Sequence, residues 1–272
     1  MKFIEKVVNI QEKNKSLLCI GLDTDITRIP DCLKGFKNPQ FEFNKRIIES
    51  TADLVCAYKL NLAFYESNGS HGYETIQQTL EIIPPEILTI GDGKRGDIGN
   101  TAEHYAKTLF ENWKFDAATV NPYMGKDSVE PFLKNDDRGV FLLALTSNPG
   151  SKDFQYLICK GKPLYEQVAI RAKKWNVKKN LGLVVGATHP TELKRIRSIV
   201  KEMPILVPGI GAQSGDLEKS VRFGCTKNGN LAVINISRGI IYASSDKDFD
   251  KKSRLAAKLF LDDINKIREK YF

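Results

Sequence analysis

The sequence contains no apolar run as long as the roughly 18 residues of a membrane-spanning helix. Residues 1–15 include acidic side chains and no uninterrupted apolar core, so we expect no signal peptide. The five cysteines form no C-x-x-C pair and have no metal-ligand spacing to the three histidines. We therefore expect a cytoplasmic protein with reduced thiols and no membrane partner, in which Cys19 and Cys56 are buried in apolar strands.

Charge of one sign is not concentrated anywhere along the chain. Lysine and arginine number 41 against 33 acidic residues, which gives a net charge of +8, but they are spread over helix-like stretches such as RAKKWNVKKN. No aromatic residues are interleaved with a basic patch, as a nucleic-acid surface would require. The pattern favours a solvated, lysine-rich surface with no nucleic-acid partner, and the positive field can attract an anionic small substrate.

Short apolar runs alternate with amphipathic stretches along the whole chain. Eight runs are expected to be strands: 16–21, 55–60, 88–92, 117–121, 140–146, 181–186, 205–208 and 231–236. Helical periodicity is found at 43–55, 101–110, 164–175, 191–200, 217–223 and 253–271, with helix-start signals at Asn100-Thr101 and His189-Pro190-Thr191.

This alternation predicts an α/β fold, a (β/α)₈ TIM barrel that forms a single domain over residues 1–272. Continuously apolar strands indicate burial on both faces, which is typical of a parallel sheet. A doubly wound open sheet is the competing architecture. The first strand, however, ends in GLDTD and not in the G-x-G-x-x-G turn of a dinucleotide fold, and no linker divides the chain.

Ionisable residues gather at the carboxyl ends of the predicted strands, where barrel enzymes build their sites. Asp92 and Lys94 are two residues apart in an extended segment and should share a face. Asp97 follows in a glycine-containing loop, and Lys59 ends the neighbouring strand, so we expect a ring of two cations and two anions. A purely structural salt-bridge cluster is the alternative, but burying ions is costly and makes such a cluster a weak stabiliser.

Ammonium groups beside carboxylates stay protonated, and a protonated lysine can stabilise a carbanion and then deliver a proton to it. A substrate carboxylate against Asp92 would be repelled, and loss of CO₂ would relieve that repulsion. The sequence has no dinucleotide loop, Schiff-base signature or metal cluster to act as another electron sink. It therefore suits decarboxylation without a cofactor, although the spacing alone does not name the reaction.

Two further segments are typical of a phosphate site. A glycine-rich turn at 207–213 follows the seventh strand, and Ser237-Arg238-Gly239 follows the eighth, where barrels commonly bind phosphate through loop N–H groups. Arg238 can bind phosphate with two parallel hydrogen bonds. The alternative is that these glycines only form tight turns and Arg238 is a surface charge.

Taken together, these motifs resemble the orotidine 5′-phosphate decarboxylase family, in its bacterial-type branch with DxKRGDIGNTA. They run in order from residue 21 to 239: GLD at 21–23, Lys59-x-Asn61, DGKRGDIGNT at 92–101, TSNPG at 146–150, PGIGAQ at 208–213 and SRG at 237–239. The resemblance implies a homodimeric barrel that converts orotidine 5′-monophosphate to UMP and CO₂ with no cofactor, the last step of UMP synthesis.

The resemblance also implies roles for the charged residues. Lys94 matches the proton donor to C6 of the pyrimidine, and Asp92 matches the carboxylate beside the departing CO₂. Lys59 matches the lysine that orders the ring and contacts the ribose. Asp97 and Thr101 match residues that reach into the site of the neighbouring subunit.

The remaining matched residues bind the rest of the substrate. Asp23 matches the acceptor of a ribose hydroxyl, and Gln213 and Arg238 match the phosphate contacts. Ser147 matches the pyrimidine contact, with Thr146 as the alternative. The loop 208–216 is expected to close over the ligand.

The nearest rivals are the sister sugar-phosphate decarboxylases and synthases, which share D-x-K-x-x-D but bind Mg²⁺. They carry an acid where this chain has Lys59, whose ammonium group would repel a divalent cation. A non-catalytic nucleotide-binding module attracted by the positive charge is a rival of another class. Alanine is usual in the branch where this chain has Gly93, so we also expect a looser end to the third strand.

Overall fold

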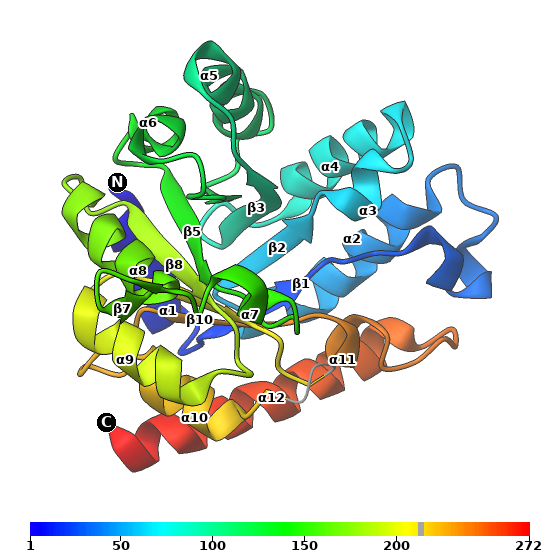
Figure 1. The fold of residues 1–272 in the computed structure, drawn as a ribbon. Helices are drawn as coiled ribbons and strands as arrows, with labels where there is room; N and C mark the ends of the chain where they lie inside the picture. Colours follow the sequence, from blue (N-terminus) through cyan, green and yellow to red (C-terminus); the bar gives the residue numbers. More distant parts are fainter. Residues whose placement is uncertain (212–214) are drawn as a thin grey trace.

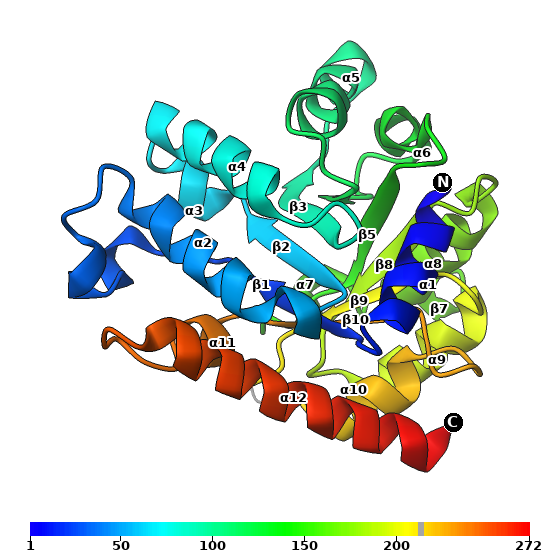
Figure 2. The ribbon, with the colours of Figure 1, turned by 180° about the vertical axis from the view of Figure 1, so that it is seen from behind.

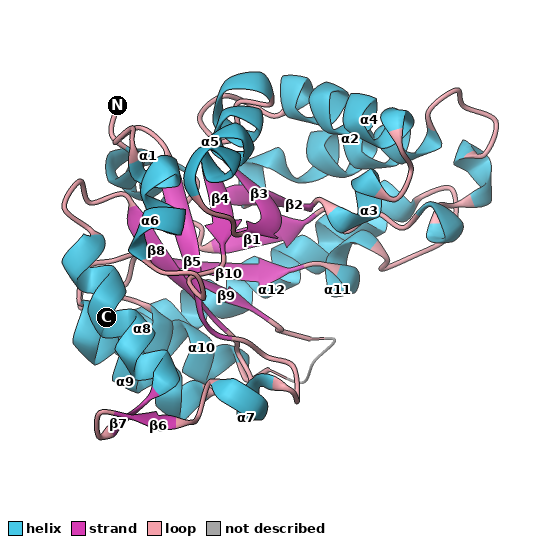
Figure 3. Ribbon diagram, turned by 45° about the horizontal axis from the view of Figure 1, so that its top comes forward, coloured by secondary structure: helices cyan, strands magenta, loops and turns pink. Residues whose placement is uncertain are grey.

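A computed structural model describes residues 1–211 and 215–272, and eight parallel strands form its closed barrel (Figures 1 and 3). The order around the barrel is β1-β10-β9-β8-β5-β4-β3-β2. The strands are β1 (Leu18–Gly21), β2 (Ala57–Asn61), β3 (Leu88–Arg95), β4 (Ala117–Val120), β5 (Gly139–Leu145), β8 (Leu181–Val185), β9 (Ile205–Pro208) and β10 (Ala232–Ile236). The predicted TIM barrel is confirmed, and the open-sheet alternative is wrong for the described residues.

Helices follow every barrel strand and surround the barrel (Figure 3). They are α1 (Phe3–Lys13), α2 (Pro39–Thr51), α3 (Ala63–Glu66), α4 (Ser70–Ile82), α5 (Gly99–Lys107), α6 (Lys126–Val129), α7 (Ser151–Phe154), α8 (Leu164–Trp175), α9 (Pro190–Val200), α10 (Leu217–Gly224), α11 (Arg238–Ile241) and α12 (Phe249–Tyr271). Short 3₁₀ turns at Ile26–Arg28, Asp31–Leu33, Ala52–Leu54 and Glu130–Leu133, a π-helical turn at Thr108–Asn112 and a small hairpin of β6 (Ile158–Cys159) and β7 (Lys162–Pro163) complete the fold.

Helix α1, which the periodicity did not predict, covers the amino-terminal end of the barrel. The ring of Phe3 packs edge-on against Phe141 of β5, with centroids 6.1 Å apart. Gln11 donates to the carbonyl of Ala232 at 2.8 Å and accepts from the N–H of Leu231 at 2.9 Å. These contacts leave the opposite end of the barrel, where the strands carry their carboxyl ends, as the place for a site.

One of the two predicted helix starts agrees with the sequence signals, and the other differs. His189 does precede the first residue of α9, where Pro190 occupies the first turn as its missing N–H allows. Helix α5 begins earlier than expected, because Gly99 adopts a positive φ of 54° and Asn100-Thr101 already lies inside the first turn.

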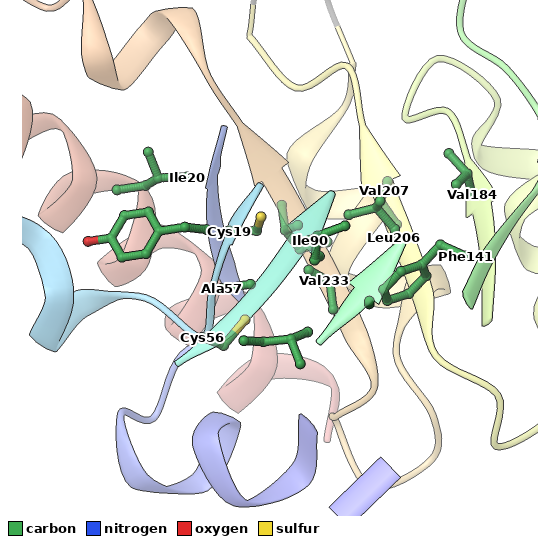
Figure 4. Close-up of a cluster of buried hydrophobic side chains, with 14 of the residues drawn as sticks. Cys19, Ile20, Cys56, Ala57, Ile90, Phe141, Val184, Leu206, Val207 and Val233 are labelled. Atoms are coloured by element: carbon green, nitrogen blue, oxygen red, sulfur yellow. The ribbon is translucent and has the colours of Figure 1, made fainter. Parts of the chain in front are cut away.

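Apolar side chains from all parts of the barrel form the core, as the continuously apolar strands predict (Figure 4). Cys19 and Cys56 are buried among them, and burial raises the pKa of the Cys56 thiol to about 12. Cys225 is buried as well, Cys32 is half-buried and Cys159 is exposed, and all five are free thiols. The predicted burial of the two strand cysteines is therefore confirmed.

The longest helix, α12, lies along one side of the barrel and packs on α2, α10 and α11 (Figure 2). Its buried residues recur at helical spacing, from Phe249 to Ile264. In the described part of the chain, no helix is both long and apolar enough to cross a bilayer.

Candidate active site

A cavity of about 350 Å³ opens at the carboxyl ends of the barrel strands. It takes its charged side chains from β2, β3 and the segments after β1 and β10, and its apolar wall from β5, β8 and β9. The lining residues are Asp23, Lys59, Asn61, Asp92, Lys94, Thr119, Leu143, Thr146, Ser147, Asn148, Val184, Leu206, Pro208, Gly209, Ile210, Asn235, Ser237 and Arg238.

Asp92 lies at the centre of the charged wall. Lys59 Nζ is 2.9 Å from Asp92 Oδ2, and Lys94 Nζ is 2.7 Å from Asp92 Oδ1. Lys59 also pairs with Asp23, with Nζ 3.4 Å from Oδ1. The result is a chain of alternating charge, Asp23–Lys59–Asp92–Lys94, along one side of the cavity.

Burial and pairing act in opposite directions on this cluster. Burial alone would lower the pKa of Lys59, but the carboxylates of Asp23 and Asp92 outweigh it and raise that pKa above its ordinary value. Burial would likewise raise the pKa of the Asp92 carboxyl, but Lys59 and Lys94 hold it well below its usual range. At neutral pH Lys59 is therefore an ammonium group and Asp92 a carboxylate.

Lys94 reaches the cavity through an irregular backbone. Its φ is +46°, which is rare for a residue with a side chain, and the pairing of β3 with β4 shifts register between Gly91 and Arg95. Asp92 and Lys94 do share a face, as expected, yet simple strand alternation is not what directs Lys94. Arg95 beyond it forms an ion pair with Glu66.

Gly93, where the resemblance leads us to expect a looser strand end, lies beside the side chains of Leu62 and Arg95. A Cβ built on Gly93 would stand 2.9 Å from Leu62 Cδ1 and 3.1 Å from Arg95 Nε. An alanine at this position would require these two flexible side chains to shift. The neighbouring side chains therefore pack close to Gly93, and the looser strand end stays a prediction.

Asp23 is held by two tyrosines beneath the cavity. Tyr65 donates its hydroxyl to the carbonyl of Leu22 at 2.8 Å, and Tyr242 is 3.3 Å from the carbonyl of Asp23. Arg28 stacks over the Tyr242 ring at 3.8 Å. These contacts fix the backbone from which the Asp23 carboxylate reaches Lys59.

Thr146 and Ser147 follow β5, and both line the cavity. The Thr146 N–H donates to Gln155 Oε1, and its hydroxyl accepts from Gln155 Nε2, both at 2.8 Å. The same hydroxyl donates to Asn148 Oδ1 at 2.7 Å. The N–H and the hydroxyl of Thr146 are therefore both used in holding the loop. The hydroxyl of Ser147 takes part in none of these hydrogen bonds.

Gly186 leaves the space that Ser147 occupies. A Cβ on Gly186 would come within 2.8 Å of the N, Cα and Cβ atoms of Ser147. Thr146 is held from the other side as well, since His189 Nε2 is 3.0 Å from its carbonyl oxygen. Sequence reasoning missed Gln155, Gly186 and His189, because nothing local indicates their contact with β5.

The opposite end of the cavity is formed after β9 and β10 by Pro208, Gly209, Ser237 and Arg238. Arg238 is exposed, and its close neighbour Ser237 packs so tightly on Gly21 that a Cβ there would stand 1.9 Å from Ser237 Oγ. Gly209 has a φ of +101°, which favours glycine. Gln213, and with it part of the loop 208–216, lies outside the described residues.

Two expected site residues are not in the cavity. Asp97 is half-buried, and its carboxylate accepts from the N–H of Ile98 at 2.8 Å. Thr101 is exposed on α5. The predicted ring is therefore wrong in one member: within one chain Asp23, and not Asp97, is the second carboxylate of Lys59.

The charged wall does not suit a divalent cation. The ammonium group of Lys59 occupies the space between the Asp23 and Asp92 carboxylates, 3.4 and 2.9 Å from them. A metal ion bound by these two carboxylates would have to displace it. No group of three or more histidine, cysteine or acidic residues with metal-site geometry occurs in residues 1–211 and 215–272.

Comparison with known proteins identifies the family of this chain. The family model described as orotidine 5′-phosphate decarboxylase / HUMPS family matches residues 16–249. The chain belongs to this family. The match begins after α1 and ends where α12 begins, so it spans all eight barrel strands.

Curated relatives resemble the chain over its whole length. The orotidine 5′-phosphate decarboxylase of Dehalococcoides mccartyi is 48% identical, with 100% of both chains covered. That of Ralstonia pickettii is 46% identical over 98% of this chain and 100% of its own. Both carry the decarboxylase name and not that of a metal-dependent sister enzyme, so the relatives do not favour the Mg²⁺ alternative.

Solved structures also resemble the chain over nearly its whole length. The OMP decarboxylase of Leishmania donovani is 39% identical, with a TM-score of 0.87 over 98% of this chain and 99% of its own. The UMP synthase of the same organism matches with a TM-score of 0.89 and 40% identity. That match covers 98% of this chain but only 57% of the longer protein.

Proposed function

We propose that this chain decarboxylates orotidine 5′-monophosphate to UMP and CO₂ without a metal or an organic cofactor, as the last step of UMP synthesis. One observation carries the proposal: a buried carboxylate, Asp92, is held between two ammonium groups on the wall of a nucleotide-sized cavity. The names of the full-length relatives support the same substrate.

Lys94 carries the chemical step. As the bond between C6 and the carboxylate carbon breaks, CO₂ leaves and the electron pair stays on C6. The Lys94 ammonium group stabilises that pair and transfers a proton to C6, and the resulting amine regains its proton from water. At an effective dielectric constant of about 20, a charge about 4 Å away contributes roughly 4 kcal/mol, and proton transfer adds to this.

Asp92 acts by repulsion and by orientation. Lys59 and Lys94 hold the pKa of its carboxyl well below the usual range, so it is ionised when an anionic substrate binds. A substrate carboxylate directed at Asp92 is destabilised, and departure of neutral CO₂ removes the repulsion. The binding energy that offsets this cost comes from the ribose and phosphate ends of the substrate.

The rest of the cavity supplies that binding energy. Asp23 and Lys59 face the ribose, and Arg238 with the loop after β9, to which Gln213 belongs, binds the phosphate. Ser147 contacts the pyrimidine, because the hydroxyl and amide of Thr146 are already used by Gln155 and Asn148.

A homodimer with a shared site is part of the proposal. Asp97 and Thr101 lie outside the cavity of their own chain and are accessible on the segment after β3. Exposed apolar residues flank them there, among them Ile98 and, after β4, Tyr123 and Met124. Such residues are typical of a subunit interface. Mixing inactive Lys94→Ala and Asp97→Ala chains should restore activity, and no recovery in verified mixed dimers would contradict the shared site.

Loss of absorbance by orotidine 5′-monophosphate, with UMP identified as product, tests the activity directly. Turnover should persist in EDTA, since Lys59 occupies the space between the carboxylates. Lys94→Ala should lose turnover while still binding UMP. No turnover by the wild-type chain, or full loss on chelation, would overturn the proposal. We also propose a cytoplasmic location, which the five free thiols support.

A further inference from the structure

A threonine of β4 bridges the two reacting residues of the proposed mechanism. Thr119 is 1% exposed and lines the cavity. Its hydroxyl is 2.8 Å from Asp92 Oδ1 and 2.9 Å from the backbone nitrogen of Lys94. The directions are unambiguous, because a carboxylate only accepts and a backbone N–H only donates. The hydroxyl therefore donates to Asp92 and accepts from Lys94.

The bond to Lys94 compensates for the shift in register between β3 and β4. Gly91 pairs with Ala118 and Arg95 with Val120, so the residues between them on β3 outnumber those on β4. Lys94 lies in this bulge with a φ of +46°, and its backbone N–H donates to the hydroxyl of Thr119. An anchored N–H helps to hold a backbone conformation that is otherwise strained.

The bond to Asp92 fixes the orientation of the carboxylate. Oδ2 accepts from Lys59, while Oδ1 accepts from both Lys94 Nζ and Thr119. The ammonium group of Lys94 is on a long side chain that is 48% exposed, and it must move when it delivers a proton. The hydroxyl of Thr119 is short, buried and tied to the strand, so it can hold Oδ1 while Lys94 moves.

We propose that Thr119 is a positioning residue that fixes both the Asp92 carboxylate and the left-handed backbone of Lys94 for the chemical step. The inference rests on the proposed decarboxylase activity. Thr119 acts through these two residues, so its loss should lower kcat and leave ground-state binding of the product nucleotide intact.

Thr119→Val, which keeps the shape and removes the hydroxyl, and Thr119→Ser, which keeps the hydroxyl, form the test pair. Hydrogen bonds to charged groups predict that Thr119→Val lowers kcat by about 10- to 100-fold. Thr119→Ser should restore kcat to within about threefold of wild type, since the bonded oxygen is retained. The dissociation constant for UMP should change by less than about twofold in either variant, because neither charge is removed.

A matched control exists at the other end of the same strand pair. Thr89 of β3 donates to Asp116 Oδ2 at 2.9 Å and accepts from the Asp116 N–H at 3.0 Å. Thr89→Val therefore removes a buried hydroxyl with the same kinds of partner, far from the cavity. It should lower the unfolding midpoint about as much as Thr119→Val and leave kcat unchanged.

The outcomes separate the two hypotheses. A wild-type chain that turns over the substrate and a Thr119→Val chain with the same kcat would overturn the role of Thr119 alone. Equal loss of kcat in Thr119→Val and Thr89→Val would also overturn it, since the effect would be structural. No turnover by wild type would overturn the activity and this role together. If Thr119→Val fails to fold, Thr119→Ala replaces it, with Thr119→Ser as its active partner.

Discussion

Lys59 and Lys94 both pair with Asp92, yet they should contribute very differently to stability. Their side chains are 4% and 48% exposed, respectively. Lys59 also pairs with Asp23, whereas Lys94 reaches Asp92 from the open side of the cavity. Replacing each in turn by methionine removes the charge and keeps an unbranched apolar stem.

The structure sets the size of the expected difference. At the 2.9 Å separation of Lys59 and Asp92, the direct attraction is about 6 kcal/mol for an effective dielectric constant of about 20. Desolvation cancels part of this, and removing one partner of a buried pair costs about 3–5 kcal/mol. Lys94 is half exposed, so its pair should contribute about 0–1 kcal/mol.

Urea unfolding and thermal unfolding, each followed by circular dichroism, measure both variants against wild type. Lys59→Met should lower the midpoint of thermal unfolding by about 6–15 °C, and Lys94→Met by about 3 °C at most. Both should lose turnover of orotidine 5′-monophosphate, so activity alone cannot distinguish them. Equal losses of stability would refute the argument that burial determines the contribution of each ion pair.

Three further predictions follow from the same geometry. The Asp92 pKa is lowered below 3.8 and the Lys59 pKa raised above 10.5. The stability advantage of wild type over Lys59→Met should therefore be constant from about pH 5 to 9 and fall below about pH 4 and above about pH 10.5; an advantage that changes within the flat range would contradict these assignments. Arg238→Ala should lower kcat/KM by about 10- to 100-fold, through lost phosphate contacts, and an unchanged kcat/KM would rule out the phosphate role. Gly186→Ala should displace Ser147 and weaken UMP binding about tenfold while affinity for ribose 5-phosphate stays the same; equal weakening of both would mean a general collapse of the site.

The sequence alone predicts the barrel and the end of it that carries the site. Every predicted strand is found to within a few residues, because a strand buried on both faces is a continuous apolar run. Helix α8 likewise spans the predicted residues, since its apolar positions follow one face. Motif order then places Lys59, Asp92 and Lys94 at adjacent strand ends, and the structure brings them together around one cavity.

Helix α4 is an element that the sequence pattern does not predict. Part of its buried face is polar, so the sequence has little apolar periodicity there. Asn44 donates to Thr79 Oγ1 at 3.0 Å, and Asn38 donates to Thr75 Oγ1 at 2.9 Å, both from α2 and its cap. The helix is held by hydrogen bonds between segments, which only the folded chain creates.

Tertiary structure also determines which charged residues pair with one another in the cavity. Local spacing indicated Asp97 as the second carboxylate of the ring, but within one chain Asp97 does not line the cavity, and the barrel closure brings Asp23 to Lys59 instead. Thr119 reaches Asp92 and Lys94 because β3 and β4 shift register between Gly91 and Arg95. Residue type and apolar pattern are local properties of a sequence, whereas register and loop direction depend on contacts between strands far apart in the chain.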